Sequence, residues 1–147
     1  MKCDLTVVRQ VEEFTDDLNK IILSDFLHRV MHPYEDKRED ILRGIDYALG
    51  LNPGGFIVLA HIEGRLAGAS VVLCTGMSGY IPPNLLLFIG VEPEIRGHGI
   101  GRKIIETITE NTKGDIKLHV EEANPARHLY ERCGFQKKYF EMRLKNE

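Results

Sequence analysis

A glycine-rich turn led by an arginine is the part of this sequence whose residue types point most directly to chemistry. Arg96 is followed by Gly97, Gly99 and Gly101, and an apolar run, 85–91, comes before it. Glycines between a buried strand and a helix leave backbone N–H groups uncovered at the helix N-terminus, where the helix dipole favours an anion. The missing Cβ atoms let a phosphate approach the main chain, and Arg96 adds a cation. We therefore expect a phosphate-binding turn.

Two other phosphate-binding motifs do not fit this stretch. The dinucleotide fingerprint GxGxxG, started at Gly97 and Gly99, needs a glycine where Arg102 stands, and the P-loop needs a Gly-Lys-Ser/Thr sequence that is absent. A tight strand-to-helix connection without a ligand would explain one isolated glycine. Three glycines behind an arginine favour phosphate binding instead.

The turn resembles the signature of the GNAT superfamily of acetyl-CoA-dependent N-acetyltransferases, Arg/Gln-x-x-Gly-x-Gly/Ala. Arg96, Gly99 and Gly101 stand at its fixed positions, and Val91-x-Pro93 before them is also typical of the family. A second block resembles the family's LxV…N…A…LYE…GF run, and its members are Leu118, Val120, Asn124, Ala126, Leu129, Tyr130, Glu131, Gly134 and Phe135. The two blocks span residues 85–135 in the family's order.

The resemblance implies a specific use for these residues with acetyl-CoA as cosubstrate. Backbone groups of Ile89, Gly90 and Val91 would pair with the pantetheine arm, and the Val91 amide would polarise the thioester carbonyl. The pyrophosphate would lie on the turn formed by Arg96, Gly97, His98, Gly99, Ile100 and Gly101. The acceptor would be a primary amine of a small molecule, a peptide or a protein.

The second block carries two further expectations. Tyr130 stands where the family usually places the phenol that protonates the departing CoA thiolate, and the alternative is a half-buried helix tyrosine whose hydroxyl lies in solvent. Asn124 lies two residues before Ala126, whereas many relatives have three. Asn124 is thus either a cofactor contact or only the cap of the following helix.

The base that takes the proton of the acceptor amine is not evident. Many relatives carry a Glu or His on the strand before the glycine turn, but residues 82–89 contain neither. His119 and Glu121, on the polar face of the next strand, are the first candidates. A water relay and a plain solvated sheet face are the alternatives, and the further candidates are Glu122, His28, His32 and Glu35. The family builds much of its acceptor site at the position of residues 28–36.

A second hypothesis is a non-catalytic acyl-CoA-binding sensor or interaction module on the same fold, suggested by the missing strand base. A third is a different acyl donor, since the turn would contact only the part that all CoA thioesters share.

Composition and charge favour a single-domain protein and argue against nucleic-acid and membrane binding. The 147 residues are 43% hydrophobic, which suits a single domain across residues 1–147. The net charge of −3 argues against nucleic-acid binding. The longest apolar run is far shorter than the ~20 residues of a membrane helix, and the N-terminus lacks a signal pattern, so we expect a cytoplasmic protein. Cys3, Cys74 and Cys133 have no CxxC spacing, so no metal site or disulfide framework is expected.

Apolar periodicity predicts the elements that position these residues. The expected order is β-α-α-β-β-β-α-β-α-β, a mixed α/β (α+β) fold. The resemblance implies a largely antiparallel central sheet, helices on both faces, and an acyl-CoA cleft between two central strands. The last segment is short, so a substrate-covering loop is either reduced or supplied by a second subunit of a homodimer. The strands are expected at 4–9, 56–61, 66–73, 85–91, 116–121 and 135–144, the helices at 11–30, 36–49, 100–113 and 124–133, and a stop after the second helix at Gly50, Asn52, Pro53 and Gly54.

Overall fold

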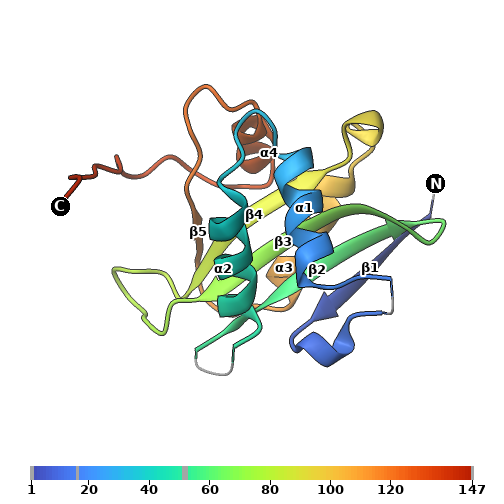
Figure 1. Ribbon diagram of the computed structural model, residues 1–147. Helices are drawn as coiled ribbons and strands as arrows, with labels where there is room; N and C mark the ends of the chain where they lie inside the picture. The colour runs from blue at the N-terminus through green and yellow to red at the C-terminus, as the bar shows by residue number, and fades with distance from the viewer. Residues whose placement is uncertain (1, 16, 51–52, 147) are drawn as a thin grey trace.

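The computed structural model describes residues 2–15, 17–50 and 53–146 and contains a five-stranded sheet whose strands lie in chain order (Figure 1). Each of the first four strands is antiparallel to its neighbour, and the fifth runs parallel to the fourth. The predicted mixed α/β fold with a largely antiparallel sheet is confirmed. The strands are β1 (Cys3–Val8), β2 (Gly55–Ile62), β3 (Arg65–Cys74), β4 (Asn84–Val91) and β5 (Ile116–Leu118).

Helices cover both faces of the sheet (Figure 1). On one face α1 (Lys20–Val30) and α2 (Arg38–Ala48) bury an apolar cluster that includes Leu23, Leu27, Ile41, Ile45 and Phe88. On the other, α3 (Ile100–Glu110) and α4 (Ala126–Arg132) bury a second cluster that includes Leu86, Ile100, Ile104, Ile108 and Tyr130. Two 3₁₀ turns complete the elements, η1 (Val11–Glu13) and η2 (Pro93–Ile95).

The predicted first helix, residues 11–30, is shorter than its apolar pattern indicates. Glu13 accepts the backbone N–H groups of Arg9 and Gln10 at 2.7 and 2.8 Å, which closes η1 as a separate turn. The side chain of Asn19 accepts the N–H of Ile22 at 2.9 Å and starts α1 at Lys20. Two local caps therefore divide a continuous apolar pattern. Asn52, part of the predicted stop after the second helix, lies outside the described residues.

The two predicted C-terminal strands also differ. β5 has three residues, 116–118, where six were expected. Within the described chain, residues 135–146 are in no strand, and the side chains of Phe140, Met142 and Leu144 are 98%, 91% and 90% exposed. Hydrophobic alternation in this segment is real, but the alternating residues have no sheet partner in the structure.

A β-bulge at Leu87 changes the direction of β4. Leu86 pairs with Val72 and Phe88 pairs with Val71, so Leu87 has no partner on β3. As a result Leu87 and Phe88 both face the α1–α2 cluster, whereas Leu86 and Ile89 face the α3–α4 cluster. The bulge thus reverses which residues of β4 point to each face, and a bulge also bends its strand.

β4 and β5 are held together at one end only. The buried side-chain amide of Asn84 donates to the carbonyls of Lys113 and Asp115 at 2.7 and 3.2 Å, which fastens the entry to β5 against the start of β4. Pairing then runs from Asn84 with Ile116 to Leu86 with Leu118 and ends there. The two strands part at the bulge.

Candidate functional site

The end of β4 that is not paired with β5 is where the family resemblance predicts that the pantetheine arm binds. Ile89, Gly90 and Val91 lie beyond the last β4–β5 pair, so β5 does not occupy this edge. A strand edge with free backbone groups can pair with an extended ligand. Gly90 faces α1, and a Cβ there would overlap Cγ2 of Val30, so glycine lets the end of α1 press against the strand.

The glycine turn leaves the N-terminus of α3 open. Gly97 and Gly99 have φ values of +85° and +81°, in the left-handed region that favours glycine. A Cβ at either position would meet no atom within 4 Å, so both glycines face open space. Gly99 is the N-cap of α3 and provides no side-chain cap. The first turn of α3 therefore has N–H groups free for an anion.

Gly101 and Ile100 have a packing role in the same turn. A Cβ on Gly101 would lie 2.7 Å from Cδ2 of Leu129, so glycine is what allows α3 and α4 to approach this closely. The Ile100 side chain is buried in the α3–α4 cluster. Packing of these two residues fixes the position of the open helix end.

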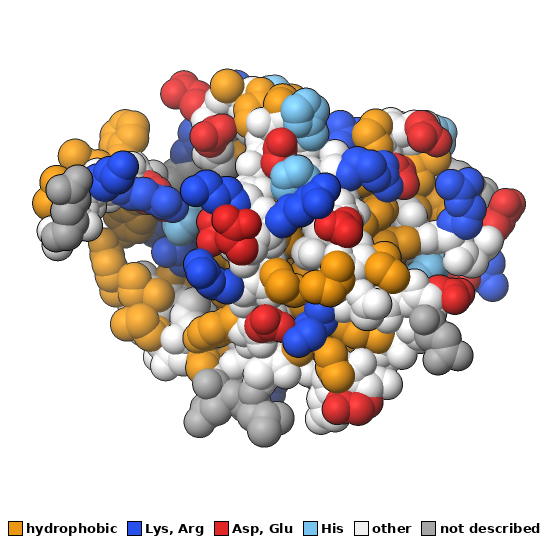
Figure 2. All heavy atoms as spheres, viewed as in Figure 1, with side chains coloured by type: hydrophobic (Ala, Val, Ile, Leu, Met, Phe, Trp, Pro, Cys, Tyr) orange, Lys and Arg blue, Asp and Glu red, His pale blue; other side chains and the backbone are white. Residues whose placement is uncertain are grey.

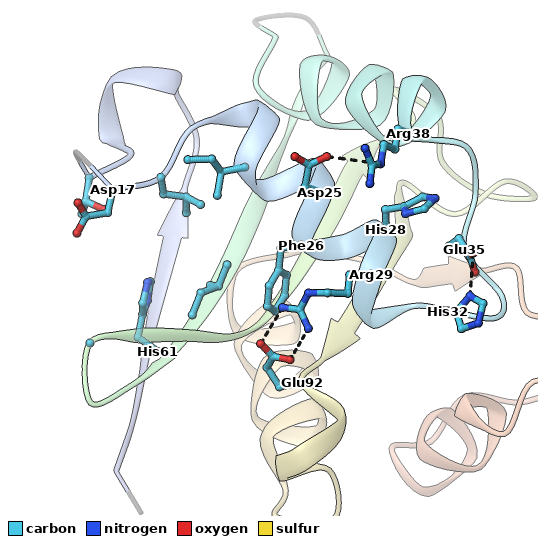
Figure 3. A pocket seen from close by; sticks show the side chains of 15 residues that line it. Asp17, Asp25, Phe26, His28, Arg29, His32, Glu35, Arg38, His61 and Glu92 are labelled. Carbon is cyan, nitrogen blue, oxygen red and sulfur yellow. Dashed lines mark hydrogen bonds and ion pairs between the residues drawn. The ribbon is translucent and has the colours of Figure 1, made fainter.

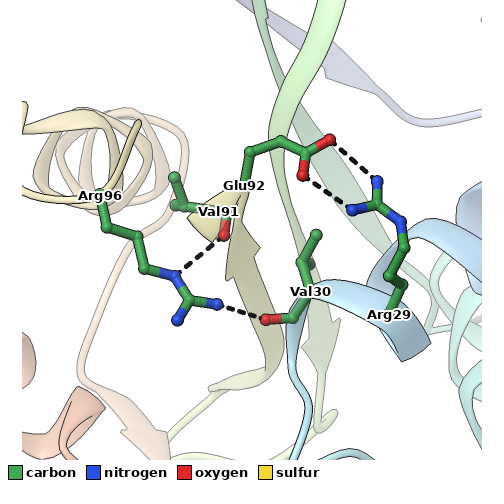
Figure 4. A network of polar contacts seen from close by, with 5 residues as sticks. All are labelled: Arg29, Val30, Val91, Glu92 and Arg96. Atoms are coloured by element: carbon green, nitrogen blue, oxygen red, sulfur yellow. Dashed lines mark hydrogen bonds and ion pairs between the residues drawn. The ribbon is translucent and has the colours of Figure 1, made fainter. Parts of the chain in front are cut away.

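Arg96 does not point its guanidinium into the glycine turn. Its Nε donates to the Val91 carbonyl at 3.1 Å, and a terminal nitrogen donates to the Val30 carbonyl at 2.5 Å (Figure 4). Val30 is the last residue of α1, so a cation here also suits the negative end of that helix. The side chain predicted to bind phosphate instead fastens α1 to the end of β4, and it occupies the Val91 carbonyl that the resemblance implied would pair with the cofactor.

An ion pair that the sequence analysis did not predict lies next to this contact. The N–H groups of both terminal nitrogens of Arg29 donate to the two carboxylate oxygens of Glu92, each at an N–O distance of 2.8 Å (Figure 4). The hydrogen bond from Arg29 lowers the pKa of Glu92, and burial partly opposes this shift. The two residues are 63 positions apart, and no spacing rule could pair them.

His98 and Asn124 make local backbone contacts. Nδ1 of His98 lies 3.0 Å from the carbonyl of Ile95, within the turn that precedes α3. The side chain of Asn124 accepts the N–H of Ala126 at 2.9 Å, at the start of α4. The N-cap position of α4 is Pro125, so Asn124 makes a local contact just before the helix, and its role toward the cofactor stays a prediction.

Tyr130 lies on α4 within the second cluster and is 8% exposed. Its ring packs edge-on against Phe135, with centroids 5.9 Å apart. Burial raises the pKa of the Tyr130 phenol to about 12, so the group carries its proton throughout the neutral range. That protonation state is the one a general acid requires.

His119 and Glu121 follow β5 and are both exposed. Nδ1 of His119 lies 3.3 Å from the carboxylate of Glu141 in the C-terminal segment, a partner that the sequence did not indicate. Glu141 is also bound by Arg143, which lowers its pKa. His119 therefore has a carboxylate neighbour.

The predicted acceptor segment, residues 28–36, borders two surfaces. Its first part, including His28, Arg29 and His32, lines a groove along α1 that reaches the β2–β3 hairpin (Figure 3). Its later part crosses toward the region after β5, where the Tyr34 hydroxyl donates to the Ala123 carbonyl at 3.1 Å. Of the residues expected to bind the cofactor, none lines the groove, so the groove is distinct from the unpaired end of β4.

The described residues contain neither a membrane-spanning helix nor a cluster of metal-ligating side chains. Residues 2–15, 17–50 and 53–146 contain no helix with the length and hydropathy to cross a membrane. The same ranges contain no group of three His, Cys, Asp or Glu side chains arranged to hold a metal ion.

Comparisons with known proteins agree with this arrangement. The family model described as the acetyltransferase (GNAT) domain matches residues 53–137. A protein of Pseudomonas phage PaMx11 named 5-NmdU N-acetyltransferase is 37% identical over 83 residues, which make up 55% of this chain and 57% of that protein. The chain thus spans a little over half the length of this relative.

Solved structures with the same architecture extend over nearly the whole chain. A GNAT family acetyltransferase from Streptococcus pneumoniae TIGR4 has a TM-score of 0.70 at 17% identity and covers 99% of this chain and 100% of its own. An aminoglycoside N-acetyltransferase, AAC(6')-Iy, in complex with CoA has a TM-score of 0.68 at 12% identity, with 99% and 97% covered. At these identities the likeness shows the fold alone.

Proposed function

This chain belongs to the GNAT acetyltransferase family, whose domain model matches more than half of it, and we propose that it transfers the acetyl group of acetyl-CoA to a primary amine. The observation that carries the proposal is the open N-terminus of α3 beside the unpaired end of β4. One feature suits a pyrophosphate and the other suits an extended, amide-containing arm. CoA contains both in a single molecule.

The donor would occupy the opening where β4 and β5 part. Its pyrophosphate would lie on the N–H groups at Gly97 to Gly101, with no Cβ from Gly97 or Gly99 in the way. The pantetheine would follow the edge of β4 at Ile89 and Gly90. Arg96 would act by holding the end of α1 against Val91 and not by direct phosphate contact.

Tyr130 would serve the sulfur of the leaving CoA. A phenol whose pKa is about 12 holds its proton more tightly than a thiol, whose ordinary pKa is about 8.5. Toward a solvated thiolate the buried phenol would therefore donate a hydrogen bond without full transfer of the proton. In a dry site the thiolate is also less stable, which favours full transfer of the proton.

The acceptor is an amine whose identity the phage relative helps to narrow. That relative is named for 5-NmdU, so 5-NmdU is the first compound to test, followed by a panel of small amines, peptides and lysine-containing proteins. The proton of the amine would pass to His119, Glu121 or water, since β4 carries no acid or histidine before Gly90.

The test combines product detection with one matched variant. We expect acetylated product by mass spectrometry when wild type, acetyl-CoA and the correct amine are combined. Tyr130→Phe should lower kcat about 100-fold or more, in the range typical of general acids, while calorimetry shows an unchanged CoA affinity. CoA binding without acetylation of any amine would instead support the alternative, a non-catalytic sensor. Absence of CoA binding would refute both.

A further inference from the structure

Ser70 places a hydroxyl inside an otherwise apolar part of the sheet. Charged side chains of both signs lie on the surface over α1 and α2 (Figure 2), whereas the sheet beneath those helices buries aliphatic side chains. Ser70 is 0% exposed and lies on β3 between Ala69 and Val71, which face that layer, so its own side chain faces α3. Its hydroxyl donates to the Phe88 carbonyl on β4 at 2.9 Å. A buried hydroxyl is costly without a partner, so this hydrogen bond ties the carbonyl to β3.

The Phe88 carbonyl belongs to the peptide unit that joins Phe88 to Ile89, just beyond the bulge at Leu87. Up to Leu86, β4 is paired on both sides, with β3 and with β5. Beyond the bulge it is paired with β3 alone, and we call its other side the open edge. The Ser70 hydroxyl therefore adds a hydrogen bond where β4 loses its second neighbour.

Two contacts further along the chain show which way the backbone groups of β4 point. The Glu92 N–H donates to the Ala67 carbonyl of β3 at 2.8 Å. The carbonyl of the residue before it, Val91, is bound by the Arg96 side chain instead. Backbone groups of successive residues in a strand point to opposite sides, so those of Val91 and Ile89 point to the open edge.

The hydrogen bond from Ser70 therefore fixes the direction of one N–H group. In a trans peptide unit the C=O and N–H bonds point in opposite directions. With the Phe88 carbonyl held on the β3 side, the Ile89 N–H is aimed at the open edge. The last β4–β5 pair is Leu86 with Leu118, so β5 leaves this N–H to a ligand. The Ile89 N–H is among the backbone groups expected to pair with the pantetheine arm.

We propose that Ser70 is a positioning residue for the acyl donor. Its hydrogen bond to the Phe88 carbonyl holds the peptide unit between Phe88 and Ile89 so that the Ile89 N–H stays aimed at the pantetheine arm. This inference rests on the proposed acetyl transfer from acetyl-CoA. Ser70 has no exposed surface with which to contact the donor, so it acts only through this peptide unit.

A comparison of two peptide units shows what the serine adds. The unit between Val91 and Glu92 is hydrogen-bonded at both its carbonyl and its N–H. The unit between Phe88 and Ile89 has to leave its N–H for a ligand, so its carbonyl is the group by which it can be held. A hydrogen bond weakens steeply as its angle falls, and a group that is already oriented avoids the cost of ordering on binding. Ser70 provides that orientation before the donor arrives.

Calorimetry with CoA and with a fragment of CoA tests this role. The fragment, 3′-phospho-ADP, has the pyrophosphate and lacks the pantetheine arm. Ser70→Ala should weaken the Kd for CoA about threefold to tenfold, up to the worth of one hydrogen bond, and leave the Kd for the fragment unchanged. Ser70→Cys keeps the size of the side chain with only a weak donor, so it should behave in the same way.

Ser24→Ala is the matched control. Ser24 is a buried serine of α1, 4% exposed, and its hydroxyl donates to the Ile21 carbonyl at 2.8 Å. Its loss removes the same kind of hydrogen bond outside β3 and β4, so CoA and the fragment should both bind as they do to wild type. Wild-type affinity for CoA in both Ser70 variants would overturn the inference. An equal loss of affinity for CoA and for the fragment would also overturn it, because that result indicates a general loosening of the domain.

Kinetics add a second readout. Ser70→Ala should lower kcat/KM for acetyl-CoA about tenfold or more, since a small misplacement of the thioester slows the attack. The KM for the amine should change less than about twofold, because the substitution disturbs only the donor edge. An amine KM that changes as much as kcat/KM for acetyl-CoA would contradict this role. A wild type that binds no CoA would refute the proposed function and this role with it, whereas wild-type CoA affinity in the Ser70 variants would refute the role alone.

Discussion

Replacing Gly99 by alanine should separate cofactor binding from folding, because the chain contains a matched glycine elsewhere. Gly99 has φ of +81° and Gly64, in the β2–β3 turn, has φ of +77°, and a Cβ on either would meet no atom within 4 Å. The two substitutions therefore impose the same backbone strain and create no clash. They differ only in that Gly99 lies at the N-terminus of α3.

The expected magnitudes follow from these facts. An L-residue in the left-handed region costs about 1–2 kcal/mol, partly offset by about 0.4–1 kcal/mol from the stiffer unfolded chain. Each variant should thus lose about 1 kcal/mol of stability, a fall of about 2–4 °C in Tm for a protein of this size. At Gly99 the methyl group would also displace a phosphate from the helix N–H groups. Losing one such charged hydrogen bond is worth about 1.5–3 kcal/mol, a tenfold to hundredfold weaker Kd for CoA.

Isothermal calorimetry with CoA and thermal unfolding without it provide the two measurements. We expect equal Tm values for Gly99→Ala and Gly64→Ala, with weakened CoA binding in Gly99→Ala alone. Equal CoA affinities in the two variants would refute the assignment of the pyrophosphate to this turn. A Tm much lower for Gly99→Ala would show that position 99 has a structural role that the open space around it does not indicate.

Two other predictions concern the contacts beside the turn. Arg96→Lys should lower the free energy of unfolding, measured by urea denaturation, by about 1–2 kcal/mol. The reason is that one ammonium cannot reproduce the paired hydrogen bonds to the carbonyls of Val91 and Val30. An unchanged urea midpoint would contradict this. Glu92→Gln should cost up to about 1 kcal/mol at pH 7, since Arg29 is largely exposed. Because the Arg29 hydrogen bond lowers the pKa of Glu92, its contribution is present above the ordinary value of about 4.3 and disappears as pH falls through the folded-state pKa. The difference between wild type and Glu92→Gln should therefore shrink below pH 4, and a constant difference across pH would argue against it.

The sequence predicted the fold well because the signals involved are local. Periodicity located the core of α3, and the turn at Glu63 and Gly64 has the two positive φ values of a tight hairpin. The glycine motif led to the correct family and to an open helix end. The boundary of α1 was wrong because side-chain caps at Glu13 and Asn19 outweigh the apolar pattern. The final strand was wrong because alternation shows which face is apolar and does not show whether a neighbouring strand is in place.

The site was harder to predict because it depends on contacts between distant segments. A leading arginine suggested a phosphate ligand, yet Arg96 binds two carbonyls, one of them 66 residues away. The partner of His119 comes from the other end of the domain, and no spacing could pair it with Glu141. The roles of Tyr130, His119 and Glu121, and the acceptor itself, stay predictions.

The bulge at Leu87 makes the number of residues in β4 decide which side chains of its second half face α1 and which face α3. The alternation of side chains between the two helix layers shifts by one residue at the bulge. Removing or adding one residue between Leu86 and Ile89 would therefore turn Gly90 away from α1 and place a side chain against that helix instead. Substituting one aliphatic residue for another leaves each β4 side chain on its present face, whereas an insertion or deletion moves the following side chains to the opposite face. We therefore expect an insertion or deletion in this part of β4 to destabilise the domain more than an aliphatic substitution at the same positions.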